Sequence, residues 1–136
     1  MNTLIKKAEE LLTECNVCTV ASVSEQGYPR ICCLMPLETV GIKEFWFSTG
    51  TSSNKVKHFS RNRKAGVTFF YGGNSVSLVG EMDIVSDKKI KDDLWRDSLI
   101  KHFPNGGNDD PEYCIIHFVA KQATIYIDDI FETIDV

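Results

Sequence analysis

The sequence has no apolar run long enough to cross a membrane, because its longest apolar stretches, such as residues 31–35 and 45–47, are only a few residues long. Residues 1–15 interleave lysines and glutamates with apolar side chains, so the apolar segment of a secretory signal is missing. The five cysteines are an odd number, which is typical of a reducing compartment rather than of a disulfide framework. We therefore expect a cytoplasmic protein that has no membrane partner.

Motifs of the common enzyme classes are missing as well. The 136 residues contain no nucleophile elbow, no P-loop and no dinucleotide-binding fingerprint. They also contain no internal repeat and no linker, and a content of 43% apolar and 25% charged residues is typical of an ordinary globular protein. This length supports one buried core, so we expect a single domain over residues 1–136.

Acidic residues are absent between residues 45 and 80, and this gap dominates the charge pattern. The charged side chains in this stretch are all basic: Lys55, Lys57, Arg61, Arg63 and Lys64. From residue 102 onwards, seven acids face a single lysine. The net charge of −4 therefore conceals a basic middle region, which favours an anionic ligand.

Single-stranded nucleic acid is one anionic ligand to consider. The basic residues lie close in sequence to Phe59, Phe69 and Phe70, as a stacking groove would require. Five basic charges in an acidic protein nevertheless fall short of the broad basic surface of most nucleic-acid binders. A small anion is therefore the preferred ligand, and nucleic acid is the alternative.

The hydrophobic pattern predicts a mainly β domain. Apolar residues recur at helical spacing over residues 4–15 and then alternate with polar residues, which predicts a helix followed by strands. The predicted strands lie within residues 17–24, 30–37, 45–48, 67–85, 113–119 and 123–127. Antiparallel strands of this kind usually close into a small barrel, and we expect one of six strands.

Local signals locate the turns and the helix starts. Gly72-Gly73-Asn74 predicts a tight hairpin turn, and Gly80, inside a strand, predicts a bulge. We expect Ser52 or Ser53 to cap a short basic helix, and Ser86 to cap a second helix. Helices and strands do not alternate regularly, which argues against a doubly wound parallel sheet.

The loop before the first of these short helices carries the strongest chemical signal. It combines hydroxyl groups, a helix N-terminus and a lysine within residues 48–55. Backbone N–H groups and the macrodipole at a helix N-terminus favour an anion, and the hydroxyls and the lysine add further donors. The loop therefore predicts a phosphate site, while a merely capped helix with a solvated basic face has the same pattern.

Cysteines and histidines do not combine into a metal site. Cys15 and Cys18 form a C-x-x-C pair, to which Cys32 and Cys33 would add two thiolates for zinc. Adjacent strand residues point to opposite faces, so Cys32 and Cys33 are poorly placed to bind the same ion. The three histidines share no ligand spacing, and His117 fits a hydrogen-bonded position in the core. We expect no metal.

Several short motifs follow one another in a specific order. They are Gly27 with Pro29, Phe47-Ser48-Thr49, Ser53-Asn54-Lys55, Asn62, residues 75–80, Leu94-Trp95, Phe103-Pro104-Asn105-Gly106 and Asp110-Pro111. In this order the chain resembles the pyridoxamine 5′-phosphate oxidase-like FMN-binding split-barrel family, particularly its general stress protein 26 type. The resemblance covers nearly the whole chain.

The resemblance implies a six-stranded antiparallel split β-barrel and a homodimer with FMN at the interface. It also implies a flavin-dependent oxidoreductase that acts on a small molecule. The FMN-binding residues that it indicates lie on the second strand and in the phosphate loop: Arg30, Ile31, Cys32, Cys33, Phe47, Ser48, Thr49, Ser52, Ser53, Asn54 and Lys55. The second strand and Phe47 would supply apolar walls for the flavin ring.

Three departures from the family pattern bear on activity. Met35 stands where pyridoxamine phosphate oxidases carry a lysine, Ser75-Val76-Ser77 replaces their Gln-x-Arg, and no arginine follows Arg96. We therefore expect no oxidation of pyridoxamine phosphate. A stress-related flavin-binding module without turnover is the alternative function, and another flavin or haem is the alternative to FMN.

Overall fold

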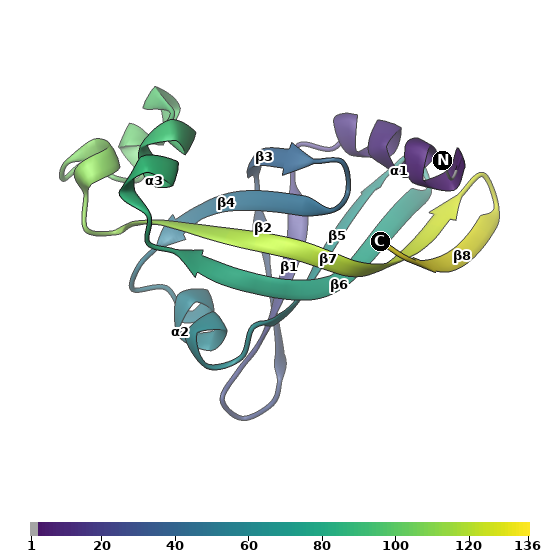
Figure 1. Ribbon diagram of the computed structural model, residues 1–136, viewed down its shortest axis with the longest axis horizontal. Coiled ribbons are helices and arrows are strands. Elements are labelled where there is room, and N and C mark those ends of the chain that lie inside the picture. Colours follow the sequence, from purple (N-terminus) through teal and green to yellow (C-terminus); the bar gives the residue numbers. More distant parts are fainter. Residues whose placement is uncertain (1–2) are drawn as a thin grey trace.

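A computed structural model describes residues 3–136, which form one curled antiparallel sheet accompanied by short helices (Figure 1). The helices are α1 (Thr3–Thr13), α2 (Asn54–Arg61) and α3 (Lys88–Leu94), with two 3-10 helices, η1 (Asp97–Lys101) and η2 (Gly107–Asp109). The strands are β1 (Cys18–Val23), β2 (Pro29–Leu34), β3 (Pro36–Val40), β4 (Glu44–Gly50), β5 (Lys64–Tyr71), β6 (Asn74–Val85), β7 (Tyr113–Ile127) and β8 (Ile130–Asp135).

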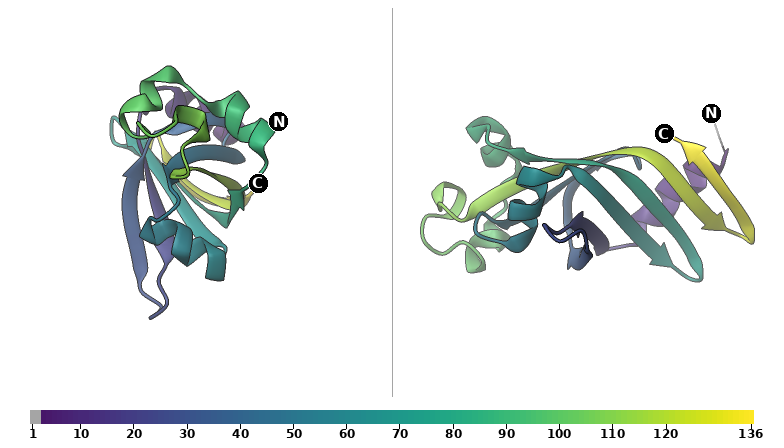
Figure 2. Two further views of the ribbon diagram at one scale, coloured as in Figure 1. Left: turned by 90° about the vertical axis from the view of Figure 1, so that its left-hand side faces the viewer. Right: turned by 90° about the horizontal axis from the view of Figure 1, so that it is seen from below.

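The strands are arranged in the order β2-β1-β5-β6-β7-β4-β3, and β8 pairs with β7. β7 is the central strand, because its first half pairs with β4, its second half pairs with β8, and β6 accompanies both halves. The sheet curls into a half-barrel whose outermost strands are β2 and β3 (Figure 2). α3 and the 3-10 helices lie at one end of the long strands, and α1 and the β7–β8 hairpin lie at the other (Figure 1).

The mainly β, antiparallel split-barrel architecture is confirmed, but the predicted count of six strands is wrong. The predicted strand at residues 30–37 is divided, because the chain leaves β1 as its partner after Leu34 and pairs with β4 from Pro36 onwards. The two strands predicted at residues 113–119 and 123–127 are one continuous strand, β7, and the strand β8 was not predicted. Asp128 and Asp129 adopt positive φ values of 53° and 65° and form the hairpin turn before it, without the Asn-Gly signature of such turns.

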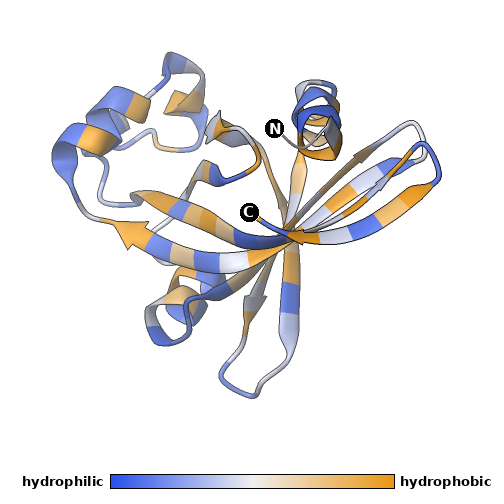
Figure 3. Ribbon diagram, turned by 45° about the vertical axis from the view of Figure 1, so that its right-hand side comes forward, coloured by the Kyte–Doolittle hydropathy of each residue, from blue (hydrophilic) through white to orange (hydrophobic). Residues whose placement is uncertain are grey.

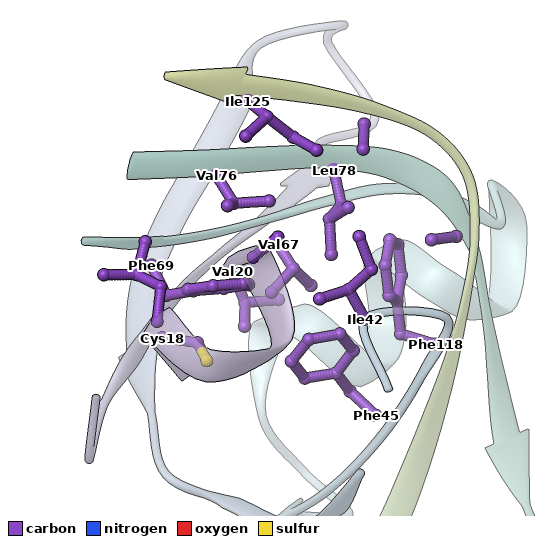
Figure 4. Packing of buried hydrophobic residues seen from close by; sticks show 14 of the residues in the cluster. Cys18, Val20, Ile42, Phe45, Val67, Phe69, Val76, Leu78, Phe118 and Ile125 are labelled. Carbon is purple, nitrogen blue, oxygen red and sulfur yellow. The ribbon is translucent and has the colours of Figure 1, made fainter. Parts of the chain in front are cut away.

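The core lies inside the curl. Strand residues alternate in hydropathy along β6 and β7, so that one face of the sheet is apolar (Figure 3). Side chains from opposite strands meet there, and Phe45 packs 6.1 Å from Phe118 and 6.2 Å from Phe69 between ring centroids (Figure 4). The helix α1 adds its buried residues, among them Ala8 and Leu11, to the same core, as its helical apolar spacing predicts.

A second, smaller apolar cluster anchors the segment between β6 and β7. It contains Leu37, Leu94, Phe103, Tyr113 and Ile115. The Tyr113 hydroxyl donates a hydrogen bond to the Lys91 carbonyl over 2.8 Å, and burial raises the pKa of Tyr113 to about 12. This cluster fixes α3 and η1 beside β3, and η1 with its flanking residues forms one wall of the candidate site.

Most of the predicted local signals are confirmed. Gly72 and Gly73 form the β5–β6 turn with φ values of 58° and 81°, and the β6–β7 register shifts between Val79 and Gly80, as a bulge requires. The predicted cap at Ser86 is wrong. Asp87 caps α3 instead, because its carboxylate accepts hydrogen bonds from the N–H groups of Lys89 and Ile90. Among residues 3–136, no helix has both the length and the apolar character needed to traverse a bilayer.

Candidate functional site

Two grooves adjoin the edge strand β2. The first, called here the α2 groove, has a volume of about 220 Å³ and is lined by Ser22, Arg30, Ile31, Cys32, Asn54, Lys55 and His58. The second, called the β3 groove, has a volume of about 500 Å³ and is lined by residues 33–37, residues 48–50, Arg96, Ser98, Leu99, Lys101 and His102. Consecutive residues of one strand, Cys32 and Cys33, therefore line different grooves.

The α2 groove is basic. Arg30 of β2 and Lys55 and His58 of α2 line it, and none of its lining residues is an acid. Burial raises the pKa of the Cys32 thiol, and the nearby Lys55 ammonium partly offsets that rise. The groove can therefore attract an anion, and no carboxylate in its walls competes for the basic groups.

The helix α2 begins at this groove. Ser53 is its N-cap, as the sequence indicated, with its hydroxyl oxygen accepting a hydrogen bond from the Val56 N–H over 3.4 Å. The Thr49 hydroxyl donates to the same oxygen over 3.3 Å. The N–H groups of Asn54 and Lys55, in the first turn, have no partner within the helix. The cap thus organises the loop and leaves the first-turn donors next to Arg30 and Lys55.

Ser52 lies outside both grooves. Its hydroxyl donates to the Glu112 carboxylate over 2.8 Å, and its N–H donates to the same oxygen over 3.3 Å. Glu112 thus occupies the donors that the sequence assigned to a phosphate. No signal in the sequence points to this pair, because the two residues are distant in the chain and meet only through the pairing of β4 with β7.

Phe47 also lies away from the grooves. Its side chain is fully buried in the core, where it stacks on Phe45 with 6.1 Å between the ring centroids. The neighbouring Ser48 and Thr49 line the β3 groove together with Cys33. Of the predicted residues, the structure thus assigns Arg30, Ile31, Cys32, Asn54 and Lys55 to the α2 groove, and Cys33, Ser48 and Thr49 to the β3 groove.

Three basic residues of the β3 groove were missed by the sequence analysis. Arg96, Lys101 and His102 all belong to the segment around η1, opposite the β2 and β4 walls of the groove. A side-chain N–H of Arg96 donates a hydrogen bond to the Leu37 carbonyl and fastens this segment to β3. The groove therefore combines an apolar wall, which includes Leu34 and Leu99, with a basic one.

Two of the four remaining basic residues of the middle region are paired with acids. Arg61 contacts Glu25 over 2.8 Å, and Arg63 contacts Asp83 over 2.7 Å. The hydrogen bond from Arg63 holds the pKa of the Asp83 carboxyl below its ordinary value. These contacts neutralise part of the basic surface near α2, which weakens the interpretation as a nucleic-acid binder.

The cysteines form no disulfide, and His117 has a structural part. All five thiols are free, and within the described residues no group of three or more histidine, cysteine or acidic side chains is arranged to hold a metal ion. His117 is half-buried, as expected for a hydrogen-bonded histidine. Its ring is 2.9 Å from a Glu44 carboxylate oxygen and stacks on Trp46 at 4.3 Å.

The outer face of the sheet has a mainly apolar depression of about 490 Å³, with Lys64, Glu81 and Lys121 among its lining residues. Small residues of β1 and β5, such as Ala21 and Gly66, pair across the strands and leave space beside Val79. The Val79 side chain is 54% exposed, and Ile31, which pairs with Ala21, is 69% exposed. We call this area the outer-face depression. Contiguous exposed apolar surface of this kind usually marks an interaction site.

Comparison with known proteins gives matches in sequence and in structure. Residues 4–126 match the family profile described as Pyridoxamine 5′-phosphate oxidase. A curated pyridoxine/pyridoxamine 5′-phosphate oxidase of Pseudomonas entomophila is 32% identical over 88 residues, which are 63% of this chain and 40% of that protein. The match thus spans well under half the length of that curated relative.

Among solved structures, a protein from Clostridium acetobutylicum related to general stress protein 26 of Bacillus subtilis has a TM-score of 0.87 and 30% identity, over 98% of this chain and 95% of that chain. A haem-binding protein from Mycobacterium smegmatis has a TM-score of 0.78 at 10% identity, over 99% of this chain and 59% of that chain, so it shares the fold alone. The profile match and the split-barrel topology agree, and the chain belongs to the pyridoxamine 5′-phosphate oxidase family.

Proposed function

We propose that the protein binds FMN along β2, with the phosphate group in the α2 groove and the flavin ring in the β3 groove. The observation that carries this proposal is the α2 groove itself. Arg30, Lys55 and the start of α2 converge there with no acid among the lining residues. Helix-terminal N–H groups together with arginine and lysine suit a phosphate monoester.

The β3 groove fits the rest of the cofactor in size and character. Its volume of about 500 Å³ lies within the usual range for small-molecule sites. Leu34 and Leu99 offer apolar surface to a flat ring, and Ser48 offers a polar group near the phosphate end. A bound flavin would supply redox chemistry, while the residues of this chain bind and orient it.

The proposed activity is a flavin-dependent oxidation or reduction of a small molecule other than pyridoxamine phosphate. Met35, a neutral side chain, lines the β3 groove where the related oxidases carry a lysine. A flavin-binding module without turnover is the second proposal, and this loss of a cation favours it. Rapid reduction of the bound flavin by nicotinamide nucleotides would favour the oxidoreductase, because a module without turnover needs no electron donor.

The first test is cofactor uptake. Purified protein mixed with FMN and passed through a desalting column should retain FMN in a ratio of about one per chain and show flavin absorption, because the two grooves together offer phosphate and ring contacts. Calorimetry should report saturable binding. A colourless protein with no heat of binding contradicts the proposal, and a Soret band after purification assigns haem to the site instead.

We also propose that a second copy of the chain covers the outer-face depression, which would place each flavin near a dimer interface. Val79→Glu should convert the dimer into monomers, because a charged carboxylate would replace an apolar side chain at the proposed contact and its desolvation is costly. Light scattering measures the mass. The control is Val40→Glu, since Val40 is 51% exposed and lies on β3, away from the depression. A wild-type monomer, or equal effects of the two variants, would refute this interface.

A further inference from the structure

His58 is the basic residue of the α2 groove that the sequence analysis left without a role. It lies on α2 three residues after Lys55, so the two side chains share a face of the helix. Both line the groove, together with Arg30 of β2. The groove is therefore surrounded by three different kinds of basic side chain: a guanidinium, an ammonium and an imidazole.

Ser22 holds the imidazole in place from the neighbouring strand. Its hydroxyl oxygen lies 2.8 Å from Nδ1 of His58, and the Ser22 residue is only 4% exposed. Ser22 also pairs directly with Arg30 in the β1–β2 register. One buried hydroxyl thus links the strand that carries Arg30 to the helix that carries Lys55 and His58.

This contact decides which ring nitrogen faces a ligand. With Nδ1 bonded to Ser22, the other nitrogen, Nε2, has no hydrogen-bond partner within residues 3–136. If the Ser22 hydroxyl donates to Nδ1, the neutral ring carries its proton on Nε2. If the ring is protonated, both nitrogens carry protons and Nδ1 donates to Ser22. In both states Nε2 is a hydrogen-bond donor, and an anion in the groove favours these states over the remaining tautomer.

From this geometry we infer that His58, oriented by Ser22, is a phosphate-binding residue that selects phosphorylated over unphosphorylated flavin. The inference rests on the proposed function. A phosphate monoester carries close to two negative charges and three acceptor oxygens, and each oxygen can accept more than one hydrogen bond, so it can use a further donor beside Arg30 and Lys55. The Nε2–H of His58 supplies a further donor, and the protonated ring supplies a further charge.

The test compares FMN with riboflavin, which has the same ring without the phosphate, by calorimetry. His58→Ala should raise the Kd for FMN about tenfold and leave the Kd for riboflavin unchanged, because one charge-assisted hydrogen bond to the phosphate is lost. Alanine is the best helix former, so α2 should persist. Ser22→Ala should raise the Kd for FMN about threefold, since the imidazole loses its anchor, and Ser22→Thr should restore the affinity.

Lys57→Ala is the matched control. Lys57 precedes His58 on α2, is exposed and does not line the groove, so the Kd for FMN should stay at the wild-type value. Equal losses for FMN and riboflavin in His58→Ala overturn the inference, and so does an unchanged Kd for FMN. In both cases the proposed function stands if Lys55→Ala still weakens FMN. If the wild-type protein binds neither compound, the proposed function itself fails.

Discussion

Gly80→Ala should lower the free energy of unfolding by about 3 kcal/mol or more. A Cβ atom at this position would lie 2.1 Å from the Val119 carbonyl oxygen and 2.9 Å from the Ala120 Cα atom. Both are backbone atoms of β7, the central strand. The clash could be removed only if β6 and β7 moved apart at their bulge. Overpacking against rigid atoms typically costs about 1–3 kcal/mol and more where nothing can move, against a total stability of about 5–15 kcal/mol.

The measurement is chemical denaturation followed by circular dichroism, with Gly66→Ala as the matched control. Gly66 lies in the adjacent strand β5, and a Cβ there would meet its nearest neighbours at 3.5 Å and 3.6 Å, which are ordinary contacts. The control should therefore change the stability by less than about 1 kcal/mol. Equal denaturation midpoints for the two alanine variants would contradict the close approach of β6 and β7.

The double variant Arg30→Gln/Lys55→Gln should lose at least about 100-fold in affinity for FMN and less than about threefold for riboflavin. Each residue is expected to make a charge-assisted hydrogen bond to the phosphate, and such bonds are worth about 1.5–3 kcal/mol each. The two residues come from β2 and α2, so neither replaces the other. Calorimetry at low ionic strength gives both constants, because salt screens the exposed part of the effect.

The control for this variant is Lys57→Gln/Arg61→Gln, which removes the same charge from the exposed side of α2. Neither residue lines the α2 groove, so the affinity for FMN should change by less than about threefold. A large loss in the control would mean that the overall charge of α2, rather than the groove, attracts the cofactor. If Arg30→Gln/Lys55→Gln lost as much affinity for riboflavin as for FMN, these side chains would contact the flavin ring, and the phosphate assignment would be refuted.

Local physical chemistry accounts for the parts of the fold that the sequence predicts. The cap at Ser53, the Gly72-Gly73 turn and the bulge at Gly80 each depend on residues within a few positions of one another, and each is present. The predicted number of strands is wrong at the point where the chain changes from one partner strand to another. Pro36 begins a strand that pairs with β4 rather than β1, and alternation within the segment carries no information about which strand lies beside it.

The candidate site also contains residues that the sequence could indicate and residues that only tertiary contacts bring there. Lys55 could be nominated from its place at the start of a helix, and Arg30 from the family resemblance, whereas Ser52 lies outside both grooves and pairs with Glu112, which comes from a distant loop. Phe47 and Ser48 are neighbours on one strand and point to opposite faces. Alternation alone could therefore have separated the two. Arg96, Lys101 and His102 reach the β3 groove through a tertiary fold-back that has no sequence signature.

The central position of β7 has a consequence for how the chain folds. During synthesis, β4 cannot pair with β7 until the ribosome has added the intervening segment, which contains α2, β5, β6 and α3. The apolar face of β4, with Phe45 and Phe47, stays exposed during that interval. Long sequence separation between paired strands slows folding and prolongs exposure to aggregation. Nascent chains that end before β7 should therefore be strong clients of chaperones, and chains that include β7 should be released from them.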